Sequence, residues 1–282
     1  MEAISIHGLT KGYGNFHLSV PELYIKEGYI TGLVGRNGAG KTTLLRMILG
    51  CIAPDTGEAL VYGQNLFDKP ELRQQVGYVS ETSFYQPNLT AQQVHDTISP
   101  FYTGWNEALY QKLMCEFEIP NLLLREFSKG QSKLFSVIMA VCFRPRLLIL
   151  DEPTANLDPA VRHRLLHLLR EFMAQEGQTV LYSTHITSDL EMVCDYLVGV
   201  QKGKISFCGE KDKILEQAVL VQGAEALLTE EAQKLFSGWE KTEYGFCGLC
   251  RDKNLAEEFF GREAIYRRPT IEELVIYGEG AK

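Results

Sequence analysis

The segment Gly35–Thr42, "GRNGAGKT", constrains this chain more than any other part of its sequence. It fits the pattern G-x-x-x-x-G-K-[ST] and lies between the strand-like stretch "GYITGLV" and a helix predicted from Lys41 to about Leu49. Glycines let backbone N–H groups surround a phosphate, and a helix N-terminus adds partial positive charge. We therefore predict a nucleoside triphosphate site, in which Lys41 acts on the β- and γ-phosphates as a catalytic residue and Thr42 binds Mg²⁺. The residues expected to contact the nucleotide here are Gly35, Asn37, Gly38, Ala39, Gly40, Lys41, Thr42 and Thr43.

The run "LLILDEP" ends in two acids after a stretch that is apolar throughout, as in a central strand buried on both faces. A carboxylate at the end of such a strand is costly to bury unless it is paired or bound to a metal, so Asp151 suits the coordination shell of Mg²⁺. Glu152 follows directly and is placed to orient or deprotonate an attacking water, which makes it a catalytic candidate. The alternative is that the two acids merely open a loop.

A histidine, His185, ends the apolar stretch "TVLYSTH", which predicts a further buried strand. Open α/β sheets bind ligands at the carboxyl ends of their strands. We therefore expect His185 to emerge beside the phosphate loop and Asp151, where it would contact the γ-phosphate as a third catalytic residue. Taken alone, it would more simply be a structural histidine.

The chain of 282 residues is long enough for one large α/β domain, predicted at residues 1–210, and an appendage at residues 211–282. After about Glu210 the sequence pattern changes to short, weakly periodic segments. "YLVGVQKGKISFCG" predicts a hairpin, and the region from Thr90 to about Phe143 is expected to be mainly helical. Two helix starts carry capping boxes, at Thr90 with Gln93 and at Ser128 with Gln131.

Composition excludes several classes of protein. The net charge of −8 disfavours a nucleic-acid partner. Seven cysteines, an odd number, indicate free thiols in a reducing compartment rather than a disulfide framework. No apolar run approaches the roughly 20 residues of a membrane span, and no leader follows Met1. We therefore expect a cytoplasmic protein without a signal peptide.

Two further pairs of residues raise the question of metal binding. Cys247 and Cys250 form a C-x-x-C pair, but the sequence offers no second pair or histidine at ligand spacing. His163 and His167 lie four residues apart on a predicted helix and could chelate a metal. Solvated positions beside neighbouring arginines are the simpler interpretation.

The order of these motifs resembles the nucleotide-binding subunit of ATP-binding cassette (ABC) transporters over about residues 1–210. The matching features are Gly35–Thr43, "DEP" at 151–153, "ANLD" at 155–158 and His185. In that family a helix starts with Leu-Ser-Gly-Gly-Gln, where this chain has "FSKGQ" at 127–131. The resemblance implies an α/β fold of the P-loop NTPase class. It has a β-rich N-terminal part, an inserted helical subdomain at about residues 86–145 and a small C-terminal α+β appendage.

The resemblance also implies how the site is completed. Two cassettes in that family enclose two ATP molecules with Mg²⁺, and the Ser-Gly helix start of one subunit binds the γ-phosphate held by the other. The expected partners are thus a second ABC ATPase subunit, identical or different, and a separately encoded transmembrane permease. Peripheral attachment to the inner face of the cell membrane follows. The additional ATP-binding residues implied are Ser128, Gly130, Gln131 and Asp158, together with Tyr13 as the aromatic that stacks on adenine.

The sequence departs from the family pattern at two positions. Lys129 replaces the first glycine of the helix start, and a lysine beside a triphosphate adds attraction. Glu81 follows the strand "VGYVS", where the family usually has a glutamine that contacts Mg²⁺ and water. A carboxylate can still be a Mg²⁺ ligand. The alternative is that Glu81 is a solvated loop acid.

Several stretches look most similar to stand-alone ATPase subunits of bacterial antibiotic and peptide exporters, including "GYVSE" and "FYTGWNEALYQKLMCEFEIP". The function expected is ATP hydrolysis that drives a transporter. A soluble ABC-type ATPase acting on ribosomes or DNA, or a regulator without turnover, is the alternative. We expect the membrane subunit to dock near "ETSFYQPNLT" at 81–90, through exposed Phe84, Tyr85 and Leu89. The alternative is that these side chains pack into the helical region.

Overall fold

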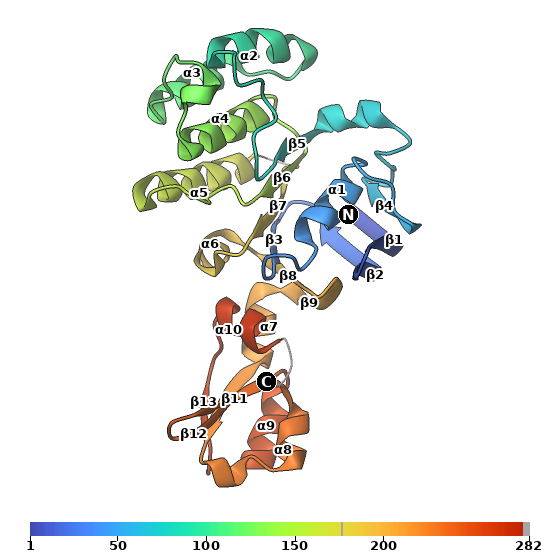
Figure 1. The fold of residues 1–282 in the computed structure, drawn as a ribbon, viewed down its shortest axis with the longest axis vertical. Helices are drawn as coiled ribbons and strands as arrows, with labels where there is room; N and C mark the ends of the chain where they lie inside the picture. Colours follow the sequence, from blue (N-terminus) through green and yellow to red (C-terminus); the bar gives the residue numbers. More distant parts are fainter. Residues whose placement is uncertain (176, 279–282) are drawn as a thin grey trace.

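The computed structural model of the chain describes residues 1–175 and 177–278. In this part, one sheet has nine strands in the order β4-β1-β2-β9-β8-β3-β7-β6-β5, and a second has four in the order β11-β12-β10-β13. Figure 1 shows the helical region at one end of the molecule and the small sheet at the other. The strands are β1 (Glu2–Tyr13), β2 (Phe16–Lys26), β3 (Ile30–Val34), β4 (Thr56–Val61), β5 (Val76–Val79), β6 (Leu147–Asp151), β7 (Thr179–Thr184), β8 (Tyr196–Gln201), β9 (Lys204–Glu210), β10 (Val219–Gly223), β11 (Phe236–Thr242), β12 (Gly245–Cys250) and β13 (Ile265–Arg267). The α-helices are α1 (Lys41–Ile48), α2 (Ala91–Ile98), α3 (Glu107–Glu116), α4 (Lys129–Cys142), α5 (Pro159–Met173), α6 (Thr187–Val193), α7 (Lys211–Gln217), α8 (Glu230–Leu235), α9 (Lys253–Phe260) and α10 (Ile271–Tyr277).

Strands β5, β6, β7, β3 and β8 form the parallel centre of the large sheet. Every residue of β3, β6 and β7 is buried, which explains their continuous apolar sequence. Parallel strands end at the same edge of a sheet. That edge therefore receives the phosphate loop after β3, Asp151 at the end of β6 and His185 after β7. The strands predicted at "LLILDEP" and "TVLYSTH" are confirmed.

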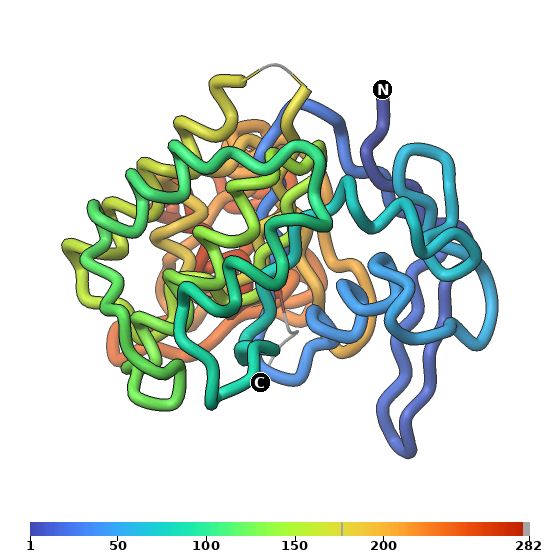
Figure 2. Tube along the Cα trace, turned by 90° about the horizontal axis from the view of Figure 1, so that it is seen from above, coloured from blue at the N-terminus to red at the C-terminus, as the bar shows by residue number. Residues whose placement is uncertain are grey.

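Antiparallel strands flank this centre. β1 pairs with β2 and β4, and β8 pairs with β9 in the predicted hairpin. Its turn lies at Lys202 and Gly203, whose φ angles of 45° and 76° suit a two-residue turn. Figure 2 shows the N-terminal strands (blue) and the helical region (green) on opposite sides of the molecule. The β-rich N-terminal part is confirmed.

The helical region consists of α2, α3 and α4, as expected for the stretch after Thr90. Both capping boxes are present, with Thr90 accepting from the Gln93 backbone and Ser128 from the Gln131 backbone. These caps satisfy backbone groups that the first turn of each helix leaves unpaired.

The side chains of His95, Asp96, Glu107 and Tyr110, the His95 cluster, join α2 to α3. The ring of His95 stacks on Tyr110 with centroids 4.3 Å apart, while its nitrogens lie 2.9 Å from Asp96 and 2.8 Å from Glu107. Burial acts to lower the pKa of His95, but the hydrogen bonds to the two carboxylates outweigh burial and raise it. The two helices are therefore held together by an interaction that favours the protonated imidazole.

One expectation about exposed side chains was wrong in part. Phe84 is 70% exposed, as expected for the segment after β5. Tyr85 and Leu89 instead pack against the core of the helical region, and Tyr85 meets Phe135 edge to face at 5.4 Å. Their apolar surface has a partner within the chain, because α4 presents a continuous buried face to this segment.

The C-terminal segments build a four-stranded sheet with α8 and α9. Phe236, Phe246 and Phe260 belong to a buried cluster that is confined to this C-terminal region. Contact with the large domain comes from α10, whose Ile271 and Leu274 belong to the same buried cluster as α6. It also comes from the small sheet, whose Leu220, Cys247 and Leu249 belong to that cluster too. The predicted boundary at residue 210 stays a prediction, and residues 279–282 of the predicted appendage lie outside the described part of the chain.

The two remaining candidate pairs form no metal-binding group in the part of the chain that the structure describes. Cys247 and Cys250 are buried free thiols on β12, and His163 and His167 are exposed on α5. Within residues 1–175 and 177–278, no three or more His, Cys, Asp and Glu side chains gather into a group suited to a metal ion. In the same residues, no helix combines the length and apolar character that a membrane crossing requires.

Candidate active site

The phosphate loop connects β3 to α1 and is shaped by its glycines. Gly38 and Gly40 have φ angles of 79° and 110°, a region that favours glycine. A Cβ on Gly35 would lie 2.2 Å from the carbonyl oxygen of Val200, so only glycine fits there. The first turn of α1 has no side-chain cap and no acidic residue. Its free N–H groups are therefore available to an anion.

Lys41, the first residue of α1, lies almost buried beneath this loop. Its Nζ donates to the carbonyl of Gly35 at 2.7 Å and lies 3.7 Å from Oε1 of Glu152. Burial lowers the pKa of Lys41, while the carboxylates of Glu152 and Asp151 oppose that shift. The ammonium is thus held by groups that a phosphate can replace.

Thr42 and Asp151 meet at the end of β6. The Thr42 hydroxyl donates to Oδ2 of Asp151 at 2.8 Å. The other carboxylate oxygen, Oδ1, is buried without a hydrogen-bond partner, which is costly for a charged group. A divalent cation beside Thr42 would satisfy it. The donor set of hydroxyl and carboxylate oxygens fits Mg²⁺, which usually takes one or two carboxylates together with substrate phosphates.

Glu152 faces the same space and is anchored to the end of β7. Its Oε2 accepts from the Thr184 hydroxyl at 3.0 Å and lies 2.8 Å from Nδ1 of His185. The backbone of Glu152 has a φ of 51°, which is uncommon outside glycine and directs the side chain out of the strand. Oε1 faces the Lys41 ammonium at 3.7 Å, and a water beside it could be oriented or deprotonated by this carboxylate.

A buried polar network centred on Asp189 holds the loop that follows Glu152. Sequence reasoning missed this network. Asp189 of α6 is fully buried and accepts from Thr154 at 2.5 Å, from Tyr182 at 2.8 Å and from Arg162 at 2.5 Å. It joins α5, β7 and α6 to the loop after Glu152. An acid beside Leu190 on the apolar face of a helix was the available signal.

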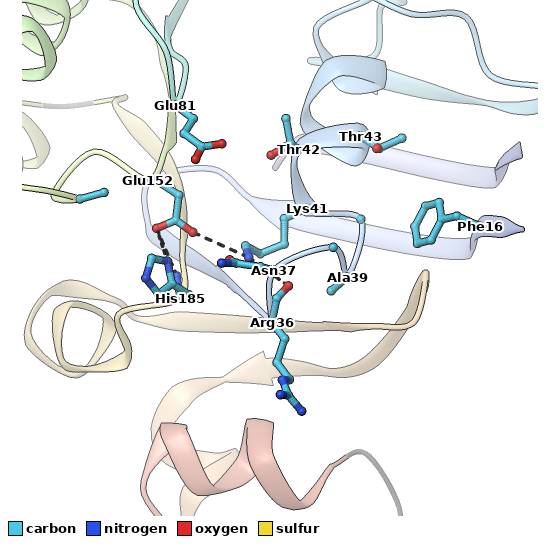
Figure 3. Close-up of a pocket in the computed structure, with 13 residues that line it drawn as sticks. Phe16, Arg36, Asn37, Ala39, Lys41, Thr42, Thr43, Glu81, Glu152 and His185 are labelled. Carbon is cyan, nitrogen blue, oxygen red and sulfur yellow. Dashed lines mark hydrogen bonds and ion pairs between the residues drawn. The ribbon is translucent and has the colours of Figure 1, made fainter. Parts of the chain in front are cut away.

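The phosphate loop, Lys41, Thr42, Glu152 and His185 line a cavity of about 440 Å³ (Figure 3). Glu81 and Thr42 face each other across it, and Glu152 lies between His185 and Lys41. One wall comes from Phe16 of β2, which the sequence analysis did not single out. Tyr13 is 48% exposed and is absent from the lining, so adenine stacking on Tyr13 stays a prediction. The described residues that line the cavity are Phe16, Arg36, Asn37, Gly38, Ala39, Gly40, Lys41, Thr42, Thr43, Glu81, Glu152, Ala155 and His185.

The helix start at 127–131 is not part of this cavity. Ser128 and Lys129 are exposed at the N-terminus of α4, and the side chains of Ser128 and Gln131 form the capping box. A Cβ on Gly130 would lie 3.3 Å from Leu157, which keeps this position tight. Asp158 is likewise exposed and caps α5. One chain therefore does not bring these residues to its own Lys41.

A glycine-rich loop over a buried lysine, with an acid at the end of another parallel strand of the same sheet, is the arrangement of P-loop nucleotide hydrolases. Known proteins narrow this class. Residues 18–155 match the family described as "ABC transporter". The relative "ABC transporter ATP-binding protein YtrB" of Bacillus subtilis (strain 168) is 31% identical over 223 residues, which cover 78% of this chain and 76% of the relative.

Two further similarities agree. "Bacitracin transport ATP-binding protein BcrA" of Bacillus licheniformis is 35% identical over 208 residues, or 70% of this chain and 66% of the relative. A solved "Structure of ATP binding subunit of ABC transporter" is 32% identical with a TM-score of 0.68, and the match covers 76% of this chain and 92% of that one. The chain belongs to the family of ABC transporter ATP-binding subunits, and it is an ATPase.

Proposed function

We propose that this protein is the motor subunit of an exporter and that it works as a dimer around two ATP molecules with Mg²⁺. The observation that carries the proposal is the separation of Ser128 and Gly130 from the cavity that contains Lys41. These residues form an exposed, capped helix start whose N–H groups suit an anion. A second chain would place them over the γ-phosphate and complete each site.

Within each site, the side chains divide the work of hydrolysis. Lys41 leaves its contacts with Gly35 and Glu152 to bind the β- and γ-phosphates. Thr42, Asp151 and Glu81 would hold Mg²⁺. The bound ion would supply positive charge where negative charge develops on the phosphate oxygens. Glu152 orients the attacking water and accepts its proton.

His185 and the second chain complete the set of contacts. His185 pairs with Glu152 through Nδ1 in this structure, and this contact fixes the carboxylate. The other ring nitrogen, Nε2, is left to contact the γ-phosphate. Ser128, Gly130 and Gln131 of the second chain would close over the γ-phosphate, with Asp158 beside the dimer contact.

Mixing two inactive variants tests the composite site. A dimer of one Lys41→Ala chain and one Ser128→Arg chain has one intact site, whereas each variant alone has none. A random one-to-one mixture should therefore recover about a quarter of wild-type ATPase activity. Lys112→Arg mixed with wild type is the control, because Lys112 is an exposed residue of α3. Substantial activity of either variant alone at concentrations where it is monomeric would contradict the proposal.

The permease would dock beside the segment at 81–90. A cavity of about 260 Å³ opens there between the large sheet and the helical region, and its wall includes Tyr78, Tyr85, Tyr102 and Phe143. The exposed ring of Phe84 lies next to Tyr78, with centroids 5.9 Å apart. An apolar element of a membrane protein on the inner face of the cell membrane fits this surface.

Cross-linking tests the docking surface. A cysteine introduced at Ser83, an exposed position, should cross-link to the co-expressed permease. Labelling confined to a cysteine placed at Tyr244, on the exposed end of the C-terminal sheet, would place the contact elsewhere. The similarity to proteins named for bacitracin transport and Nod factor export supports the exporter part of the proposal.

A further inference from the structure

A buried lysine outside the recognised motifs connects α4 to the edge of the sheet that carries the site. Lys133 lies one turn after the cap of α4 and is 7% exposed. Its Nζ donates to the carbonyl oxygens of Ser80 at 2.7 Å and Glu81 at 2.8 Å, and lies 3.4 Å from the carbonyl oxygen of Asp151. Three acceptors match the three N–H groups of an ammonium.

Two of these carbonyls belong to Glu81 and Asp151, whose carboxylates face Thr42, and the third belongs to Ser80. β5 and β6 are parallel neighbours, and Ser80 and Glu81 follow β5 as Asp151 ends β6. Beyond Ser80 the chain leaves the sheet and becomes exposed. The ladder of sheet hydrogen bonds therefore does not hold Glu81, whereas Lys133 does.

The charge of Lys133 addresses a second difficulty at this edge. Glu81 adds a third carboxylate to those of Asp151 and Glu152, and three like charges around one cavity repel each other. All three attract the Lys133 ammonium. Lys41 and Lys133 together raise the formal charge of this group of side chains from −3 to −1. Without Lys133, repulsion would favour movement of the exposed Glu81 side chain into solvent.

We propose that Lys133 is a positioning residue that holds the Glu81 carboxylate toward Thr42 and Asp151, where it can serve as a Mg²⁺ ligand. This inference rests on the Mg²⁺ site proposed above. Because Lys133 acts through Glu81, its removal matters only while the Glu81 carboxylate is present. This predicts a specific form of non-additivity.

The test measures binding of adenosine 5′-O-(3-thiotriphosphate) as Mg²⁺ is titrated, so that no turnover is needed. Lys133→Met should raise the Mg²⁺ concentration for half-maximal binding by about tenfold, as for other residues that orient metal ligands. Glu81→Ala should raise it by a similar factor. The double variant should lie within about twofold of the worse single variant. Lys112→Met, which removes an exposed lysine on α3, should leave the value unchanged.

The outcomes separate the two ideas. If Glu81→Ala leaves the Mg²⁺ requirement unchanged, Glu81 is not a Mg²⁺ ligand. The inference about Lys133 then fails as well. A shift in each single variant that multiplies in the double variant overturns the inference alone, because Lys133 would then act independently of Glu81. If Lys133→Met does not fold, Lys133→Gln, which keeps a donor but no charge, takes its place in the same comparison.

Discussion

Replacing Glu152 by Gln should separate ATP binding from ATP hydrolysis. The amide keeps the shape of the side chain and can still accept from Thr184 and His185 through its oxygen. It cannot accept a proton from water. We expect turnover to fall by about 10²-fold or more, the usual range for loss of a general base.

The same change should tighten nucleotide binding, because Glu152 holds Lys41 in this structure. The Lys41 ammonium lies 3.7 Å from the carboxylate, with side-chain exposures of 7% and 10%. At an effective dielectric of about 20, the attraction is roughly 4 kcal/mol before desolvation is subtracted. Desolvation cancels most of this in a buried pair. A net gain of about 1 kcal/mol, or roughly fivefold in Kd, follows when Lys41 no longer has to leave Glu152.

The assay pairs phosphate release with equilibrium binding of ATP to the Glu152→Gln chain. Glu58→Gln, an exposed position on β4, serves as the matched control and should change neither quantity. Turnover near the wild-type level would move the role of general base to another residue. Weaker binding with lost turnover would show that Glu152 supports the site mainly through its structure, which contradicts the reasoning from the Lys41 pair.

Two further predictions concern the metal and the helical region. Glu81→Ala should raise the Mg²⁺ concentration needed for half-maximal ATPase activity by several-fold, roughly the loss of one oxygen ligand. An unchanged requirement and rate would make Glu81 a solvated loop acid. The His95 cluster should stabilise α2 against α3 at acidic pH. Because folding raises the pKa of His95, its contribution is complete below the unfolded value of about 6.5 and is lost as pH rises through the higher folded value. In urea unfolding, Glu107→Gln should therefore cost more stability at pH 6 than at pH 9, and an equal cost at both would contradict this.

The sequence predicted the central strands and the helix starts because each carries a local signal. A continuous apolar run indicates a strand buried on both faces, and a capping box such as Ser128 with Gln131 indicates a helix start. The positions of Lys41, Asp151 and His185 followed from the same reasoning, since parallel strands end at one edge. The structure brings Lys41, Asp151, Glu152 and His185 together as expected.

What the sequence did not reveal depends on how elements pack. Phe16 reaches the cavity only because β2 lies against the phosphate loop. Lys133 has no local mark that distinguishes it from a solvated lysine, and its burial follows from the orientation of α4 over β5. Tyr85 was expected to be exposed for the same reason: its environment is created by Phe135, fifty residues further along the chain.

The packing of α10 on α6 determines what deletion of the C-terminal region would do. Ile271 and Leu274 cover the apolar face of a helix that begins two residues after His185. A chain truncated after β9 would leave that face open to water and would loosen the support of His185. Heating the intact protein should therefore give one calorimetric transition rather than two. Loss of activity in a truncated chain would then follow from weakened packing around His185. It would not show that the C-terminal sheet itself takes part in ATP hydrolysis.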